Sequence, residues 1–184
     1  MKGLMKKALS DSLKESLTKK SLNKITINEI VKKCGVNRQT FYYHFKDIYD
    51  LLEWTLNVNI KNYEEELTVS DLDPIEYAYT SLLRNKKIIL NAYSSADSRW
   101  INNYLIRVFE DLIIKIFEDN GIHEKLSKEN EDFLIRFYSN GLAGIVIVWI
   151  ENGMSDEYSD DLLKINQLID LRLKNIKNGS GYFS

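Results

Sequence analysis

Side chains that can hydrogen-bond to a nucleic acid gather in residues 38–46, which read RQTFYYHFK. Successive residues of a helix turn by about 100°. If Phe41 and Phe45 point inward, Gln39 and Tyr43 therefore point outward. The outward face then carries amide, phenol, hydroxyl and ammonium groups but no carboxylate. Such a face suits a phosphate-lined groove, which would repel an acidic side chain.

The first turn of this segment holds the two side chains best suited to reading bases. The guanidinium of Arg38 can donate two hydrogen bonds to a guanine edge, and the amide of Gln39 can pair with adenine. Helices that enter the major groove usually present their N-terminal residues to base edges. The alternative is that both side chains are ordinary solvated polar groups. The apolar neighbours are expected to form a small core.

Two short helices joined at a glycine must position these groups. Thr26 and Glu29 have the spacing of a capping box, which predicts a helix from residue 27 to about residue 34. Gly35 can adopt the left-handed conformation that ends such a helix. Asn37 is a good N-cap for the next helix. This order of elements is typical of a helix-turn-helix.

The segment from Thr26 to Lys46, TINEIVKKCGVNRQTFYYHFK, resembles the DNA-binding signature of the TetR family of regulators. The resemblance implies an N-terminal three-helix DNA-binding domain, residues 1–46, called the head below. It also implies a larger helical domain, residues 47–184, for effector binding and dimerisation. The expected function is a sequence-specific transcription regulator, here a repressor, that binds a pseudo-palindromic operator in double-stranded DNA as a homodimer. A transcriptional activator or a co-regulator controlled by a partner protein is the alternative.

The resemblance also assigns roles to side chains of the head by matching positions. Those expected to face bases are Arg38, Gln39 and Tyr43, and those expected to grip or flank phosphates are Thr26, Thr40, Tyr42, His44 and Lys46. One departure follows this segment, where family members often have Asn-Lys-Glu. Here the residues are Asp47, Ile48 and Tyr49, so a phosphate-clamping lysine is missing. Lys46 and lysines of the first helix must supply more of that grip.

Helical spacing of apolar residues continues along nearly all of the 184 residues, and no stretch alternates strictly enough to predict a strand. The expected fold class is all-α, with about nine helices. Their expected ranges are 4–20, 27–34, 38–45, 47–67, 74–84, 86–93, 98–119, 128–152 and 157–177. Residues 21–24 are expected to form a loop. Asp73 and Pro74 have the pattern of an N-cap followed by the first helical residue.

The net charge of −2 is unevenly distributed along the chain. Residues 1–50 contain 11 basic and 5 acidic residues, a net charge of +6, whereas residues 51–184 contain 14 basic and 22 acidic residues, a net charge of −8. A basic N-terminal part on an acidic body indicates that the first part meets a polyanion. Solvated lysine-rich helix faces would give a similar count, so charge alone leaves both interpretations open.

Small residues in the long helix near the C-terminus predict the dimer contact. Glycines there leave a smooth patch that a second helix can approach closely, although packing within one chain could use the same patch. Residues 137–153 are similar to the penultimate helix of a Firmicutes-type branch of the family, which includes regulators of dihydroxyacetone kinase operons. The expected dimer-interface residues are Gly141, Gly144, Val148 and Trp149.

Aromatic residues with polar tips are candidates for an effector pocket in the C-terminal domain. Those expected to touch a ligand are Tyr93, Trp100, Tyr104 and Tyr138. Aromatic residues at helical spacing also serve as core, which is the alternative for each. The expected effector is a small, largely apolar molecule, and control by a partner protein is the second possibility. No cofactor is expected.

Several other classes of protein fit the sequence poorly. The two histidines, His44 and His123, lack neighbours at metal-ligand spacing, and no phosphate loop or nucleophile motif is present, so neither a metal site nor an enzyme is expected. A purely protein-binding helical module would not need the basic, tyrosine-rich face. No secretory leader or membrane-crossing stretch is recognised. The single cysteine, Cys34, fits a reducing cytoplasm and is expected to be a small core residue.

Overall fold

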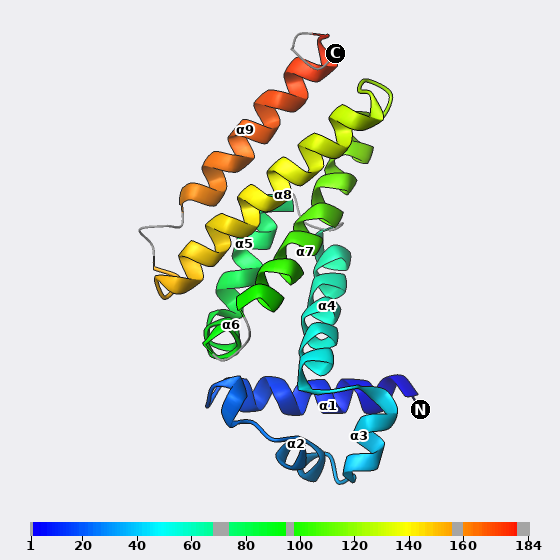
Figure 1. Cartoon of the computed structure of the whole chain (residues 1–184), viewed down its shortest axis with the longest axis vertical. Helices are drawn as coiled ribbons and strands as arrows, with labels where there is room; N and C mark the ends of the chain where they lie inside the picture. The colour runs from blue at the N-terminus through cyan, green and yellow to red at the C-terminus, as the bar shows by residue number, and fades with distance from the viewer. Residues whose placement is uncertain (1, 68–73, 95–97, 156–159, 180–184) are drawn as a thin grey trace. The chain divides into compact units, whose positions relative to one another are not determined.

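Helix caps and glycines divide the chain into helices in the computed structural model, which describes residues 2–67, 74–94, 98–155 and 160–179 (Figure 1). The elements in these ranges are α1 (Lys2–Leu17), the 3₁₀ turn η1 (Leu22–Lys24), α2 (Ile27–Lys33), α3 (Arg38–His44), α4 (Ile48–Leu67), α5 (Pro74–Arg84), α6 (Lys86–Tyr93), α7 (Ser98–Asp119), α8 (Lys128–Glu151) and α9 (Asp160–Lys177). The described residues contain no strand, and the all-α prediction is confirmed. The expected loop at residues 21–24 contains η1 instead.

The predicted start signals are present where the structure describes them. The Thr26 hydroxyl accepts a hydrogen bond from the Glu29 backbone N–H, and the Glu29 carboxylate accepts one from the Thr26 N–H, which completes a capping box. Asn37 and Ser127 cap α3 and α8 in the same way with their side-chain oxygens. The expected cap at Asp73 lies outside the described residues.

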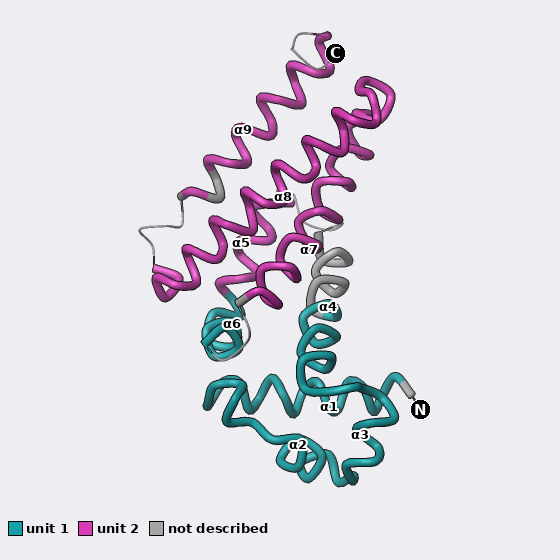
Figure 2. The backbone as a smooth tube through the Cα atoms, viewed as in Figure 1, with its two compact units in different colours: residues 1–71, 84–97 teal, residues 72–83, 98–184 magenta. Residues whose placement is uncertain are grey.

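The helices pack into two compact units (Figure 2). Unit 1 comprises residues 1–71 and 84–97, and unit 2 comprises residues 72–83 and 98–184. By packing, α4 and α6 thus belong with the helices of the head. The expected functional boundary between residues 46 and 47 concerns DNA binding rather than packing, and it stays a prediction.

The core of unit 1 is organised around α1, which contacts α2, α4 and α6. Three leucines four residues apart, Leu9, Leu13 and Leu17, lie on one stripe of α1 and are fully buried. The Ser12 hydroxyl donates a hydrogen bond to the Ile30 carbonyl, which ties α1 to α2. The Asn91 side chain donates to the Leu17 carbonyl over 2.7 Å and ties α6 to the end of α1. The head therefore has direct contacts with α6.

Unit 2 is built on the packing of α8 against α7 and α9. Trp149 of α8 is 1% exposed, and its ring stacks on Tyr79 of α5 with centroids 5.1 Å apart. Its indole N–H donates to the Ser155 carbonyl, so the polar atom of this buried ring is also satisfied. Helix α5 is thereby joined to the α7–α8–α9 core.

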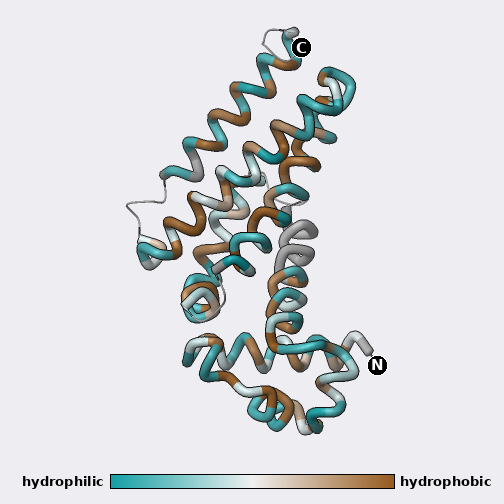
Figure 3. The backbone as a smooth tube through the Cα atoms, in the orientation of Figure 1, coloured by the Kyte–Doolittle hydropathy of each residue, from teal (hydrophilic) through white to brown (hydrophobic). Residues whose placement is uncertain are grey.

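Helix α8 is the most apolar element of the chain, and apolar positions recur along it in Figure 3. By length and composition alone it could cross a membrane, which the sequence analysis did not anticipate. Half of the most apolar 18-residue stretch of α8 is buried inside the protein, as expected of a helix that packs in a core. The apolar character of α8 is thus explained in part by its central place in unit 2.

Candidate nucleic-acid interface

A tight turn joins α2 and α3 and sets the direction of α3. Gly35 has φ +67°, a left-handed conformation that residues with a Cβ rarely adopt, so the chain can reverse immediately after α2. The Val36 backbone N–H returns to the Val31 carbonyl over 3.0 Å. Asn37 then accepts from the Thr40 N–H and starts α3. These local hydrogen bonds restrict the backbone conformation of the first turn of α3.

The inner side of α3 is anchored by aromatic residues. Phe41 is fully buried and Phe45 nearly so, with ring centroids 5.9 Å apart. Phe45 also contacts the Trp54 ring of α4 edge-on, and Lys6 of α1 lies over the Phe45 ring at 5.2 Å. The expected small core is present, and it attaches α3 to both α1 and α4.

The outer side of α3 is open to solvent. Arg38, Gln39 and Lys46 are exposed, and Tyr43 has 67% of its surface exposed. Tyr42 on the flank is 50% exposed. Thr40 and His44 are half-buried, and Thr26 at the start of α2 is exposed. All eight residues expected to contact DNA are therefore reachable from solvent, on α3, directly after it at Lys46, and at the N-terminus of α2.

Two of these side chains are already in contact. The Arg38 guanidinium donates a hydrogen bond to the Tyr42 hydroxyl over 3.1 Å, and it lies 5.8 Å from the centre of the Tyr42 ring. A neighbouring contact pairs the Tyr43 ring edge-on with the His44 ring at 5.0 Å. The sequence spacing of four residues made the first contact possible, but our sequence analysis did not identify it.

The carboxylates of Glu29 and Glu15 are bonded to other groups of the head. The carboxylate of Glu29 accepts from Lys20 and from the Thr26 backbone, and these bonds lower its pKa from 4.5 to about 2. Glu15 has a pKa below its usual value because Lys19 and Lys33 bind its carboxylate. These acids therefore neutralise Lys19, Lys20 and Lys33, and neither of the two pairs with a residue of α3.

The first turn of α4 is capped by two further carboxylates. Asp47 accepts from the N–H groups of Tyr49 and Asp50 and thereby caps the start of α4. Asp50 reaches back to the Lys46 N–H over 2.8 Å. The donors at this helix start, which would otherwise suit an anion, are therefore bonded to the protein's own side chains.

Acid should weaken this region in a defined range of pH. Because the folded pKa of Glu29 is depressed, its stabilising contribution is complete above about pH 4.5 and is lost as the pH falls toward about 2. We expect Glu29→Gln to be less stable than the wild type at pH 7 and to lose less further stability between pH 4.5 and 2. Urea denaturation followed across this range would check it, and an unchanged pH slope in the variant would contradict the assignment.

Cys34 lies at the end of α2 with its thiol near the Ala8 carbonyl, 3.4 Å away. Partial burial raises the pKa of the thiol, which disfavours the reactive thiolate. Cys34 is half-buried and lies at the edge of the contact between α2 and α1, rather than within the core as expected.

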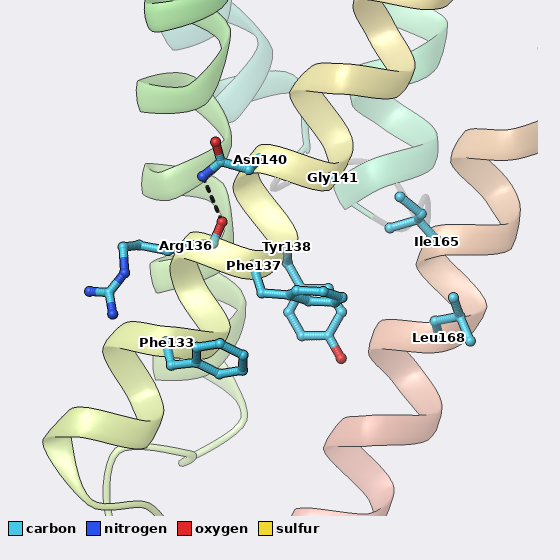
Figure 4. A pocket seen from close by; sticks show the side chains of 8 residues that line it. All are labelled: Phe133, Arg136, Phe137, Tyr138, Asn140, Gly141, Ile165 and Leu168. Carbon is cyan, nitrogen blue, oxygen red and sulfur yellow. Dashed lines mark hydrogen bonds between the residues drawn. The ribbon is translucent and has the colours of Figure 1, made fainter.

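The four candidate effector residues occupy different places. Tyr138 lines a groove of about 580 Å³ between α8 and α9, seen from close by in Figure 4. Trp100 and Tyr104 stack on one another along α7, with planes 5° apart. Tyr93 ends α6 and belongs to unit 1. Within unit 2 the groove thus includes Tyr138, and a ligand site formed by all four residues stays a prediction.

The expected dimer residues divide into exposed and buried ones. Gly141, Gly144 and Val148 are exposed on α8, whereas Trp149 is packed against Tyr79 within its own unit. A Cβ added to Gly144 would meet nothing within 4 Å. The smooth patch is therefore open on one side of α8, and the Trp149 ring is not part of it.

Large apolar side chains that the sequence analysis missed extend this patch. Those with between 44% and 60% of their surface exposed are Phe133, Phe137 and Val148 of α8 and Leu168 and Leu171 of α9. The three on α8 lie at helical spacing with the two glycines and form one stripe, since residues three or four apart share a face. We call these five residues with Gly141 and Gly144 the apolar face. Only the recurrence of Phe133 and Phe137 four residues apart could have indicated it.

His123 in the α7–α8 connection contacts the buried Glu131 carboxylate of α8, and Glu118 lies 3.9 Å from its other ring nitrogen. Lys128 is 3.7 Å from the same Glu131 carboxyl group. In the part of the chain that the structure describes, no group of three or more His, Cys, Asp or Glu side chains is arranged to hold a metal ion. His123, Glu118, Glu131 and Lys128 instead form a network of side-chain contacts at the start of α8.

Comparison with known proteins covers most of the chain. Residues 11–54 match the family described as "Bacterial regulatory proteins, tetR family", and residues 72–171 match the family described as "Transcriptional regulator C-terminal region". The solved structure of the dihydroxyacetone kinase operon activator DhaS is similar over 92% of this chain and 96% of that chain, with a TM-score of 0.66. Its sequence is 17% identical, so the likeness is one of fold. No curated protein sequence matches the chain.

Proposed function

Because the chain belongs to the TetR family of bacterial regulatory proteins, we propose that α3 reads a pseudo-palindromic operator from the two protomers of a homodimer. A protein of this family is a DNA-binding transcription regulator and not an enzyme. The observation that carries the proposal is the outer side of α3, where a guanidinium, an amide and two phenols are exposed and no carboxylate is present. Such a surface can enter a groove lined by phosphates.

Each side chain has a role that fits its place. Arg38, Gln39 and Tyr43, in the first turns and on the outer side of α3, are proposed to contact base edges. The proposed phosphate contacts are Thr26, Thr40, Tyr42, His44 and Lys46. The Thr26 hydroxyl keeps its capping role, and its exposed position at the helix start leaves it reachable by a phosphate.

A binding experiment should distinguish side chains that contact bases from those that contact phosphates. We expect Arg38→Ala or Gln39→Ala to reduce discrimination between operator and random DNA by about 1–3 kcal/mol for each lost bidentate pair. Lys46→Ala should instead weaken both DNAs about equally and reduce the slope of log affinity against log salt by about 1. Fluorescence anisotropy at several salt concentrations would measure both quantities.

The control is Lys174→Ala, which removes an exposed lysine of α9 and should change neither quantity. Binding that does not depend on salt, or equal losses on operator and random DNA for all three variants of the head, would refute the proposed roles.

We assign dimerisation to the apolar face of α8 and α9. Exposed apolar surface of this extent is unfavourable in a soluble monomer and usually marks an interaction site. A second copy related by a two-fold axis presents the same face and can cover it, giving a bundle of α8 and α9 with their copies. Dimerisation also places two heads for the two halves of an operator.

The proposed regulatory mode is repression in the cytoplasm, in which the dimer bound at its operator blocks transcription. The structurally similar DhaS is by name an operon activator, which makes activation the alternative. Transcription from the operator-bearing promoter in vitro, with and without the protein, separates the two by the sign of the effect.

Control by an effector is proposed for the C-terminal domain, with Tyr93, Trp100, Tyr104 and Tyr138 as ligand-contacting residues. Tyr93 ends α6, and Asn91 of the same helix bonds to the end of α1. A small apolar molecule at Tyr93 could therefore act on the head through α6, to the extent that it binds two states with different affinity. A metabolite that stabilises the protein but leaves operator affinity unchanged would count against this switch, and a dedicated protein partner would favour the alternative.

A further inference from the structure

We propose that Tyr42 is a positioning residue for base recognition, which holds the Arg38 guanidinium in the orientation that reads the operator. The proposal rests on the proposed function and deepens it, because the family resemblance assigns Tyr42 to phosphates alone. It starts from the contact between these two side chains on neighbouring turns of α3.

The contact has two parts that together restrict the arginine. An Arg38 terminal nitrogen, Nη2, donates to the Tyr42 hydroxyl over 3.1 Å, and the guanidinium carbon lies 5.8 Å from the ring centre. A hydrogen bond fixes the end of the side chain, while attraction to the ring fixes its path along the helix. A long exposed arginine would otherwise sample many rotamers.

Tyr42 can hold Arg38 because Tyr42 is itself braced. Its ring stands edge-on against Phe41, with centroids 5.5 Å apart and planes at 87°. Phe41 is fully buried and packs on Phe45. A continuous series of contacts thus runs from the small core of the head, through the half-exposed Tyr42 ring, to the charged group at the start of α3.

The contact leaves Arg38 able to bind a base. A guanidinium has five N–H donors, and the bond to Tyr42 uses one of them. Two others suffice for the paired hydrogen bonds to the O6 and N7 atoms of guanine. The Tyr42 hydroxyl accepts in this contact, so its own O–H can still donate to a phosphate. Positioning Arg38 and touching the backbone are therefore compatible.

The test uses the full-length protein and an operator selected from random duplex DNA. Tyr42→Phe keeps the ring and its contact with Phe41 but removes the hydroxyl. We expect discrimination at the base pair read by Arg38 to fall roughly three- to tenfold, the net effect of losing one ordinary solvent-exposed hydrogen bond. Loss of the Tyr42 phosphate contact should weaken operator and random DNA alike and therefore leave this discrimination unchanged. Tyr79→Phe, the same substitution in unit 2, is the matched control.

A double-mutant cycle makes the mechanism specific. Arg38→Ala should abolish the preference at that base pair, and adding Tyr42→Phe should then lower discrimination no further. If Tyr42→Phe still reduces discrimination without Arg38, Tyr42 reads DNA directly and the proposal is wrong. Equal loss on operator and random DNA, with discrimination unchanged, would identify a phosphate contact alone and overturn the proposal.

Tighter binding by Tyr42→Phe would also overturn the proposal, because it would mean that Tyr42 withholds Arg38 from DNA. These outcomes differ from failure of the proposed function itself. In that case the wild type would show no preference for any DNA sequence, and no operator would be selected.

Discussion

Phe41→Ala is expected to abolish operator binding while leaving the protein dimeric. Phe41 is fully buried and is the central ring of the head, in contact with both Tyr42 and Phe45. Truncating a buried phenylalanine costs about 3–5 kcal/mol, which is a large part of the stability of a small domain. The inner anchor of α3 is lost with it, so the exposed side chains no longer share one rigid helix. Gel shift and urea denaturation would measure the two effects.

Leu4→Ala is the control, because Leu4 is 74% exposed on α1 of the same unit and its truncation should change stability by less than about 0.5 kcal/mol. A Phe41→Ala variant that keeps both its stability and its operator affinity would show that α3 is not held by this core. A variant that dissociates into monomers would show that the head contributes to the dimer.

Gly144→Leu should separate the dimer into folded monomers. Within one chain a Cβ added at Gly144 meets nothing within 4 Å, and leucine is a better helix former than glycine. In a two-fold dimer the new side chain enters the interface twice. Overpacking costs about 1–3 kcal/mol at each site, so the dissociation constant should rise by roughly 30-fold to 10⁴-fold. Sedimentation velocity at micromolar concentration would follow the change.

The matched control is Gly3→Leu, which makes the same substitution at an exposed helical glycine of α1 that also meets nothing within 4 Å. It should leave the sedimentation coefficient of the dimer unchanged. An intact Gly144→Leu dimer, or a wild type that is monomeric at the same concentration, would remove the apolar face from consideration as the interface.

The order and approximate ends of the helices followed from the sequence because local chemistry determines them. Thr26 and Asn37 cap the helices that they were expected to cap, and Gly35 has the expected left-handed conformation. The turn η1 was not predicted, since three residues carry no periodicity. The grouping of α6 with α1 was also not predictable, because the Asn91 bond to Leu17 joins residues distant in sequence.

The outer side of α3 was predictable for a different reason. The short helix has one pair of inward aromatic residues, so their position fixes the direction of every other side chain. The contact between Arg38 and Tyr42 depends on rotamers, which spacing permits but does not select.

The apolar face and the groove beside Tyr138 were harder to predict. Helix α8 is apolar on most sides, so its pattern does not distinguish the buried Trp149 from the exposed Phe137. That distinction is made by α5, whose Tyr79 covers Trp149 from 70 positions earlier in the chain. Aromatic residues of a core and of a pocket look alike in sequence, and for that reason the four candidate ligand residues could not be ranked.

The carboxylates at the start of α4 have a consequence for how such a regulator finds its target. A chromosome offers about 10⁶–10⁹ competing sites, and the hold on them comes from phosphate contacts. Ile48 stands where relatives often carry a lysine, and its neighbours Asp47 and Asp50 bring negative charge and bind the available N–H donors. A weaker phosphate grip lowers affinity for operator and bulk DNA alike and leaves their ratio unchanged. We therefore expect a shorter stay at each competing site, and so a faster search for the operator, without a change in base discrimination.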